Sequence, residues 1–183
     1  MINIDFFKNI TILLIKKNII PDYHIDKITE LPNLLKKHFV NKKGIILDID
    51  QTIVPYSSSI LSKEILETIE LISKEYKCCL VSNSHRSVTN NKRMKTLEKL
   101  THLKVIKQVK KKPDPIIFIQ AIKFLGTDFS ETIMVGDRIF TDIVGANNLC
   151  ITSILVEPID VSTDPILIRL IRLFETFIYK IIT

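Results

Sequence analysis

The chain has 183 residues, of which 46% are hydrophobic and 25% are charged, and this balance excludes disorder as the default state. Its net charge of +6 favours anionic partners, but no nucleic-acid-binding signature occurs, so we expect no nucleic acid. Three cysteines form neither a disulfide framework nor a metal-ligand spacing. The N-terminal part lacks a cleavage site for secretion and is too short and charged to span a bilayer. We therefore predict a protein that is not secreted, in a cytoplasm or a plastid stroma, with peripheral membrane contact left open.

The first 43 residues are predicted to form a helical extension. An apolar helix is predicted from about Ile4 to Ile19, and a second helix begins with Pro32 in its first turn. The apolar run Ile45-Ile46-Leu47 then predicts a buried parallel strand, bounded by Gly44 and followed directly by two acids. Buried strands rarely end in two carboxylates, so we expect these acids either to cap a structural element or to bind a ligand.

From Gly44 onward, strands and helices alternate. Strands are predicted at Gly44–Asp48, Cys78–Ser82, Leu103–Ile106, Thr132–Val135 and Ile151–Val156. Helices are predicted from Ser59 or Ser62 to Tyr76, around Met94–Leu100, around Ile117–Leu125, up to about Asn147, and from Pro165 onward. This alternation predicts an α/β fold, a doubly wound, Rossmann-like parallel sheet covered on both faces. We expect one domain, with a catalytic core over 44–157 and an amphipathic C-terminal helix over 158–183.

Ligands of such sheets bind beyond the carboxyl ends of the strands. The polar residues predicted there are Asp48, Asp50, Ser82, Asn83, Asp137 and Asp142. Residues two apart in a strand point the same way, so Asp48 and Asp50 are expected to need a cation or a proton between them. Several carboxylates without a nearby His or Cys favour Mg²⁺ over zinc. Lys112, which precedes Pro113, is the predicted fixed cation of this site.

Four segments carry a family resemblance. DIDQT, VSN, the lysine of KKP and VGDRIFTD, in this order, resemble the four motifs of the haloacid dehalogenase (HAD) phosphatase superfamily. More narrowly, IIPDYHIDKITELP, KPDPIIFIQAIKFLG and TSILVEP resemble the YqeG-like subfamily of HAD subfamily IIIA, which includes mitochondrial and plastid phosphatidylglycerophosphate phosphatases. The connections between these motifs hold little more than one helix each, so we expect no cap domain and an open site that suits a bulky substrate.

The resemblance implies a role for each matching residue. Asp48 would be the nucleophile, Asp50 the general acid and base, and Lys112 a cation on the phosphoryl group. Thr52, Ser82 and Asn83 would contact the substrate phosphate. The implied ligands of Mg²⁺ are Asp48, Asp50 (through its main-chain carbonyl), Asp137 and Asp142, the last of these acting on the metal or on its surroundings.

The predicted function is a Mg²⁺-dependent phosphatase that works through an aspartyl phosphate, with phosphatidylglycerophosphate as its substrate by resemblance. Two alternatives stay open: a phosphatase of a soluble phosphate ester, and a non-enzymatic phospho-Asp receiver or binding module. Gln51 departs from the subfamily, which usually has Asn or another small residue there. In the C-terminal segment, Arg169, Arg172, Thr176 and Lys180 share one helical face, which fits packing on the sheet and, less well, a membrane interface.

Overall fold

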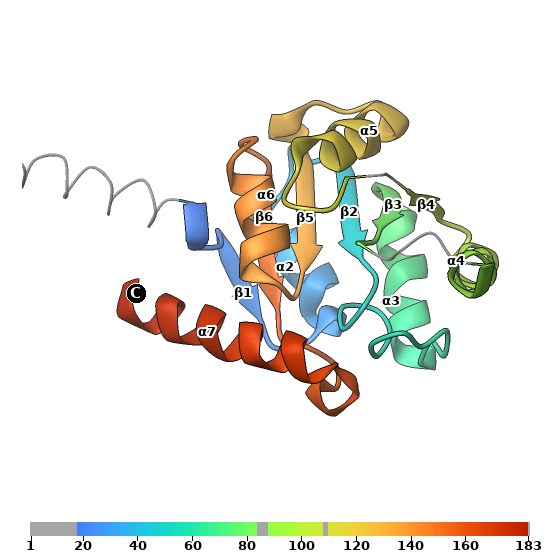
Figure 1. Ribbon diagram of the computed structural model, residues 1–183. Helices are drawn as coiled ribbons and strands as arrows, with labels where there is room; N and C mark the ends of the chain where they lie inside the picture. The colour runs from blue at the N-terminus through green and yellow to red at the C-terminus, as the bar shows by residue number, and fades with distance from the viewer. Residues whose placement is uncertain (1–17, 84–87, 108–109, 183) are drawn as a thin grey trace, which may run out of the picture.

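The structure, a computed structural model, describes residues 18–83, 88–107 and 110–182, so most of the helix predicted from Ile4 lies outside the described residues. Six parallel strands form one sheet in the order β1-β6-β5-β2-β3-β4 (Figure 1). Their bounds are β1 (Tyr23–Ile25), β2 (Gly44–Asp48), β3 (Lys77–Val81), β4 (Lys104–Ile106), β5 (Thr132–Gly136) and β6 (Thr152–Val156). The predicted doubly wound parallel sheet is confirmed.

One strand was not predicted from the sequence. β1 pairs with β6 at the edge of the sheet, with Tyr23 opposite Ile154 and Ile25 opposite Val156. Only Ile25 of its three residues is buried. So short a strand contains too little alternation of polar and apolar residues to predict it.

Helices cover both faces of the sheet because the central strands are buried on both sides. The helix bounds are α2 (Leu31–His38), α3 (Lys63–Ser73), α4 (Val88–Thr101), α5 (Pro115–Leu125), α6 (Val144–Asn147) and α7 (Ile166–Ile182). Ile45 and Leu47 of β2 pack with α2, α3 and α4, whereas Ile46 between them packs with α5 and α6 on the other face.

Local signals place the helix ends. The Ser62 side chain caps α3 by accepting a hydrogen bond from Ile65 N, and the Asp114 side chain caps α5 by accepting one from Ile116 N. Gly126 ends α5 in the left-handed conformation, with φ 62°. The segment between β2 and β3 contains α3 as its only regular helix, so no cap domain is inserted there.

The strand order reverses at β2, which lies between β5 and β3. The chain runs outward from β2 through β3 and β4, and then returns to β5 on the opposite side. This is the point at which doubly wound sheets bind ligands. Figure 1 shows the arrows of β2 and β5 pointing toward the end of the molecule where α7 lies.

The C-terminal helix α7 packs against this end of the sheet. Ile178, Tyr179 and Ile182 contact a small cluster that includes Ile143 and Leu155. None of the helices in residues 18–83, 88–107 and 110–182 has the length and hydrophobicity needed to cross a membrane.

Candidate active site

Three carboxylates meet at the ends of two central strands. Asp48 is the last residue of β2, Asp137 follows β5, and Asp142 lies in η3 (Ile139–Ile143), a turn of π-helix. Each offers one ligand oxygen within 4.8 Å of the others, and the three residues are 7%, 5% and 0% exposed, respectively. The structure therefore brings together three of the four predicted metal-binding residues.

Gly136 makes room for this cluster. A Cβ atom at this position would lie 2.5 Å from Cγ of Asp142, closer than atoms can approach. The Asp142 carboxylate is fixed from the other side by Arg138, whose main-chain N–H donates to Oδ2 at 3.1 Å. The sequence Gly-Asp at the end of β5 thus allows Asp142 to approach Asp137 from the following turn.

Lys112 is the cation of the cluster, whereas its neighbour Lys111 is exposed. Its Nζ pairs with Asp48 Oδ1 and lies 2.6 Å from Asp142 Oδ1. The Asn83 side chain holds the Lys112 backbone: Oδ1 accepts from Lys112 N at 2.7 Å, and Nδ2 donates to Lys112 O at 3.2 Å. The Asn83 side chain therefore positions Lys112. The predicted contact of Asn83 with the substrate phosphate would be made by the main-chain N–H of Asn83.

Two other predicted substrate contacts lie beside the carboxylates. Thr52 is fully buried, and its hydroxyl donates to Asp137 Oδ1 at 3.3 Å. Ser82, directly after β3, is half-buried at the same edge of the sheet. Thr52 therefore contacts a carboxylate rather than open space, while Ser82 stands where a ligand beyond the strand ends would lie.

The cluster carries more negative than positive charge and little water reaches it. Burial raises the pKa of Asp48 well above its usual range, and the charges of Asp142 and Asp137 add to this effect although Lys112 opposes it. Burial likewise raises the pKa of Asp137 to about 6. Burial alone would lower the pKa of Lys112, but Asp142 and Asp48 raise it above its usual value. A cation bound among these carboxylates would relieve the repulsion.

The donor set fits Mg²⁺. All three side chains offer carboxylate oxygens, the ligands that Mg²⁺ prefers. Asp142 Oδ1 is buried, and among the described residues it contacts Lys112 Nζ at 2.6 Å. A carboxylate oxygen has a second lone pair beside the one that faces the ammonium group, so it can also bind a hard cation.

Asp50 differs from the expectation based on strand geometry. Its carboxylate does not lie in the three-carboxylate cluster but pairs with Arg93 of α4, whose Nη2 is 2.6 Å from Asp50 Oδ1. The rule that residues two apart point the same way holds only within a strand, and β2 ends at Asp48. Gln51 then turns the chain with φ 65°.

Helix α7 reaches the site through a polar face. Arg172 pairs with Asp137 and donates through Nε to Asp164 Oδ2 at 2.6 Å. Arg138 pairs through Nε with Glu175 of α7 at 2.9 Å. Arg172 and Glu175 thus link α7 to the adjacent residues Asp137 and Arg138, directly after β5.

The unusual Gln51 ties the first motif to the segment before α7. This residue is fully buried, and its Nε2 donates to Asp160 O, Thr163 Oγ1 and Asp164 Oδ1 at 2.7, 2.9 and 2.8 Å, while its Oε1 accepts from Asp160 N at 2.8 Å. An asparagine is one methylene shorter and would not span these contacts. The left-handed backbone conformation of Gln51 costs free energy for a glutamine, and these hydrogen bonds offset that cost.

We expect Gln51→Ala to lower the free energy of unfolding by about 2–4 kcal/mol, because it leaves buried polar groups around Asp160 and Asp164 without partners. Urea unfolding followed by circular dichroism measures the change. Gln120→Ala on the exposed side of α5 is the matched control and should change stability by less than about 0.5 kcal/mol. A loss of similar size in both variants would contradict the role given to Gln51.

Sequence reasoning missed two arginines of this region. Arg93 lies in a polar helix, where nothing distinguishes it from its charged neighbours. Arg172 had a signal: it lies one turn before Glu175 in α7, a helix whose residues are mostly apolar. Charged residues at such spacing inside an apolar segment indicate buried partners, which here are Asp137 and Arg138.

Comparison with known sequences agrees with this site. The family model for mitochondrial PGP phosphatase matches residues 5–160. The chain is 28% identical over 164 residues to the probable phosphatase YqeG of Bacillus subtilis, covering 88% of this chain and 90% of that protein. It is 31% identical over 144 residues to the chloroplastic/mitochondrial phosphatidylglycerophosphate phosphatase 1 of Arabidopsis thaliana, covering 75% of this chain but 41% of the plant protein. The chain therefore spans less than half of the plant relative.

Comparison with solved structures concerns the fold alone. An uncharacterized protein from Listeria monocytogenes serotype 4b superposes with a TM-score of 0.52 at 22% identity, covering 67% of this chain and 85% of the other. A haloacid dehalogenase-like hydrolase from Streptococcus pneumoniae has a TM-score of 0.50 at 13% identity, covering 64% and 85%. The resemblance stated from the motifs is confirmed. The chain belongs to the mitochondrial PGP phosphatase family and is a phosphoric monoester hydrolase.

Proposed function

We propose that this phosphatase uses Mg²⁺, works through an aspartyl phosphate on Asp48, and acts on phosphatidylglycerophosphate. The observation that carries the chemistry is the cluster of Asp48, Asp137 and Asp142 around Lys112 at the ends of β2 and β5. The substrate rests on the family match and on the plant relative, which is named as a phosphatidylglycerophosphate phosphatase. The receiver alternative loses its support, because the family is one of enzymes.

The first chemical step forms the aspartyl phosphate. A carboxylate oxygen of Asp48 bonds to phosphorus, the bond between phosphorus and the alcohol oxygen breaks, and Asp50 gives its proton to that oxygen. Lys112, in contact with Asp48, stabilises negative charge on the phosphoryl oxygens. Mg²⁺, when bound by Asp48, Asp137, Asp142 and the main-chain carbonyl of Asp50, supplies the positive charge that lets one anion approach another.

The second step regenerates the enzyme. Asp50, now a carboxylate, takes a proton from a water molecule whose oxygen bonds to phosphorus. The bond between phosphorus and Asp48 breaks, and inorganic phosphate leaves. Asp50 is protonated again and Asp48 is a carboxylate, so the cycle closes with one water consumed.

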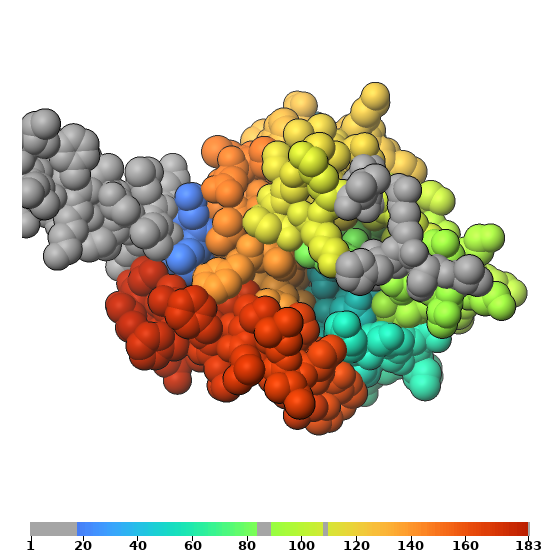
Figure 2. Space-filling view, viewed as in Figure 1, coloured from blue at the N-terminus to red at the C-terminus, as the bar shows by residue number. Residues whose placement is uncertain are grey.

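A lipid substrate is supported by the outer face of α7. Large apolar side chains form this face, and seven of them are more than half exposed: Ile166, Leu167, Leu170, Leu173, Phe174, Phe177 and Ile181. The charged Arg172 and Glu175 point the other way, into the protein. Figure 2 shows α7 on the surface of the molecule with its outer side uncovered. This outward part of the apolar surface is therefore exposed, whereas Ile178, Tyr179 and Ile182 of the same helix pack on the protein.

We propose that this face lies on an anionic lipid surface on the cytoplasmic or stromal side of a membrane. The net charge of +6, with Lys180 exposed near the end of α7, complements anionic headgroups. Exposed apolar side chains with basic neighbours are typical of interfacial helices. Because Arg172 of the same helix contacts Asp137, a helix resting on lipid would hold the strand ends close to the headgroups.

The substrate is tested by phosphate release. Phosphatidylglycerophosphate in mixed micelles and a panel of soluble phosphate esters are compared with Mg²⁺ and with EDTA. We expect preferential hydrolysis of the lipid that stops in EDTA. Hydrolysis of soluble esters alone would agree with the proposed mechanism but reject phosphatidylglycerophosphate as the substrate. Activity unchanged by EDTA would reject the requirement for Mg²⁺.

Binding of Mg²⁺ also has a readout that does not depend on turnover. At a concentration 100 times its dissociation constant, Mg²⁺ should stabilise the protein by about 2.7 kcal/mol, which raises the melting temperature by roughly 5–10 °C for a chain of this size. Asp142→Asn should lose most of this shift, whereas the exposed Asp26→Asn should keep it. An equal shift in both variants would place the metal elsewhere.

Lipid contact through α7 is tested with vesicles that contain phosphatidylglycerol. Replacing Leu173 and Phe177 by serine should weaken co-sedimentation about tenfold or more, because each side chain contributes about 1.5–3 kcal/mol when buried. Phe124→Ser on α5, which is 54% exposed, is the matched control and should bind like the wild type. Unchanged binding of the α7 variant would reject the lipid surface, as would a monomer that becomes a dimer through this face without binding vesicles.

A further inference from the structure

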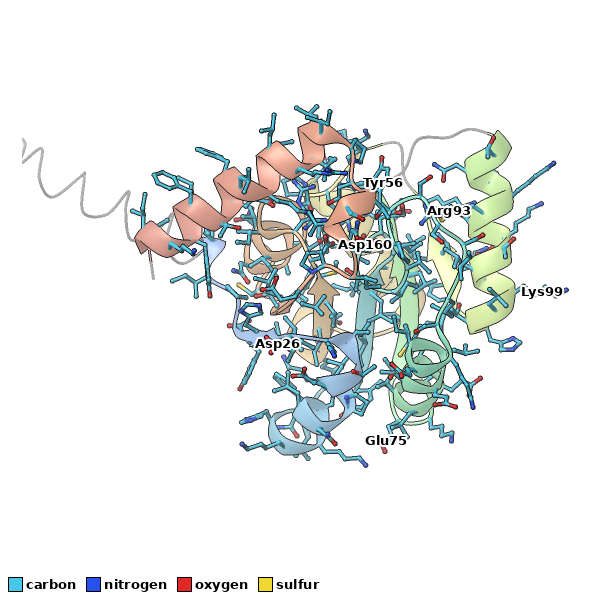
Figure 3. The ribbon with its side chains drawn as sticks, turned by 90° about the horizontal axis from the view of Figure 1, so that it is seen from below. Asp26, Tyr56, Glu75, Arg93, Lys99 and Asp160 are labelled. Carbon is cyan, nitrogen blue, oxygen red and sulfur yellow. The ribbon has the colours of Figure 1, made fainter. Side chains whose placement is uncertain are left out.

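Arg93 holds the carboxylate of Asp50 from a helix outside the strand ends. Its side chain, 9% exposed, extends from α4 with Nη2 at 2.6 Å from Asp50 Oδ1 and Nη1 at 3.3 Å from Asp50 Oδ2. Its Nε donates to the carbonyl of Ser58 at 2.7 Å, so the guanidinium plane is itself fixed. Figure 3 looks onto the carboxyl ends of the strands and places Arg93 between α4 and the loop that carries Tyr56.

The two oxygens of Asp50 are held unequally. Oδ1 accepts hydrogen bonds from Arg93 Nη2 and, at 2.8 Å, from the main-chain N–H of Ser57. Oδ2 has only the longer contact with Arg93 Nη1. Two short charge-assisted or main-chain bonds on Oδ1 fix the carboxylate plane, and the remaining oxygen keeps a lone pair available.

This asymmetry matters for proton transfer. A carboxylate on a loop outside a strand can rotate about its terminal torsion, which has a broad energy profile. A general acid works only when the oxygen that carries the proton lies within hydrogen-bond reach of the atom that receives it. A misplacement of about 1 Å can reduce a rate about 100-fold.

We propose that Arg93 is a positioning residue that anchors Oδ1 of Asp50, so that Oδ2 is the oxygen that exchanges protons with the leaving group and with water. This inference rests on the proposed role of Asp50 as general acid and base. In the first step the proton on Oδ2 passes to the alcohol oxygen as its bond to phosphorus breaks. In the second step Oδ2 takes the proton from the attacking water. Arg93 neither gains nor loses a proton in either step.

The inference identifies the class of substrate for which Arg93 matters. An alkoxide is a poor leaving group and needs a proton as it departs, so esters of unactivated alcohols depend on a well-placed acid. A nitrophenolate leaves without protonation. Loss of Arg93 should therefore slow the first step for an alkyl phosphate far more than for p-nitrophenyl phosphate, whereas a merely structural defect would slow both alike.

The experiment compares first-turnover rates for these two kinds of ester. The alkyl ester is phosphatidylglycerophosphate, or glycerol phosphate if only soluble esters are hydrolysed, and the aryl ester is p-nitrophenyl phosphate, with the burst of nitrophenolate as signal. Arg93→Gln should lower the alkyl rate about 100-fold and the aryl burst rate less than about threefold. Arg93→Lys keeps one charge without the two-pronged geometry and should recover part of the alkyl rate. Lys95→Gln, exposed on the same helix, is the control.

Asp50→Asn separates the failure of this inference from failure of the proposed function. If Asp50→Asn selectively slows the alkyl ester and Arg93→Gln slows both esters equally or neither, the positioning role is rejected while the general acid remains. If Asp50→Asn slows both esters equally, the acid role fails, and the inference fails with it. Absence of hydrolysis of either ester by the wild type would reject both.

Discussion

We expect Asp48→Asn to reduce kcat for any phosphate ester by about 10⁴-fold or more, because it removes the atom that takes the phosphoryl group. An amide oxygen is a weak nucleophile, and the other two carboxylates of the cluster are held in place by contacts that Asp48 lacks: Asp137 by Arg172 and Thr52, and Asp142 by the Arg138 main chain. Steady-state phosphate release with saturating Mg²⁺ measures the loss.

The same variant should remain folded. Burial raises the pKa of Asp48, which means that a charged carboxylate is disfavoured there, and a neutral amide of the same shape avoids that cost. Lys112 keeps Asp142 as its partner. Circular dichroism verifies folding, and Asp26→Asn serves as the matched control for activity. Activity of Asp48→Asn within tenfold of the wild type would contradict the assignment of the nucleophile.

The second large effect concerns stability. We expect Lys112→Met to lower the free energy of unfolding by about 3–5 kcal/mol at pH 8 in EDTA, because it leaves Asp48 and Asp142 buried without their cation. Urea unfolding at several pH values is the measurement. Lys99→Met, an exposed position on α4, should change stability by less than about 0.5 kcal/mol.

The loss caused by Lys112→Met should depend on pH in a defined direction. The pKa values of Asp48 and Asp137 are already raised by burial, that of Asp137 to about 6, and Lys112 opposes both shifts. A carboxyl group whose pKa is raised in the folded state contributes stability below its usual pKa and loses it as the pH rises through the folded value. The deficit should therefore be small near pH 4 and grow past pH 6. An equal deficit at both ends of this range would contradict the electrostatic explanation.

The parts of the site that the sequence predicts are those placed by strands. Asp48 ends β2 and Asp137 follows β5, and because these strands are neighbours in the sheet, the meeting of the two acids follows from the α/β pattern. Lys112 follows from the Lys-Pro of its motif, and the structure distinguishes it from Lys111 by burial. The position of Asp142 near Asp137 is predicted because only four residues separate the two acids in the short segment after β5.

The parts that the sequence does not predict depend on side chains that reach across the fold. Arg93 and Asp50 lie 43 residues apart, and no period connects a loop acid with one arginine of a polar helix. For α7, hydropathy reveals an apolar face but not its direction, since Arg172 and Glu175 find buried partners only once the Asp137 and Arg138 segment is folded. The sequence marks Gln51 only as a departure from the subfamily, whereas in the structure its side chain connects the loop after β2 with the segment before α7.

The most direct test of the proposed chemistry is to trap the phosphorylated enzyme. Asp50→Asn lacks the base of the second step, so after reaction with p-nitrophenyl phosphate and Mg²⁺ the intermediate should accumulate. Acid quenching, peptic digestion at low pH and mass spectrometry then locate the phosphoryl group. We expect it on Asp48, and absent when Asp48 is also replaced by Asn. A phosphoryl group on another residue, or nitrophenolate release with no phosphorylated peptide, would contradict the aspartyl-phosphate mechanism.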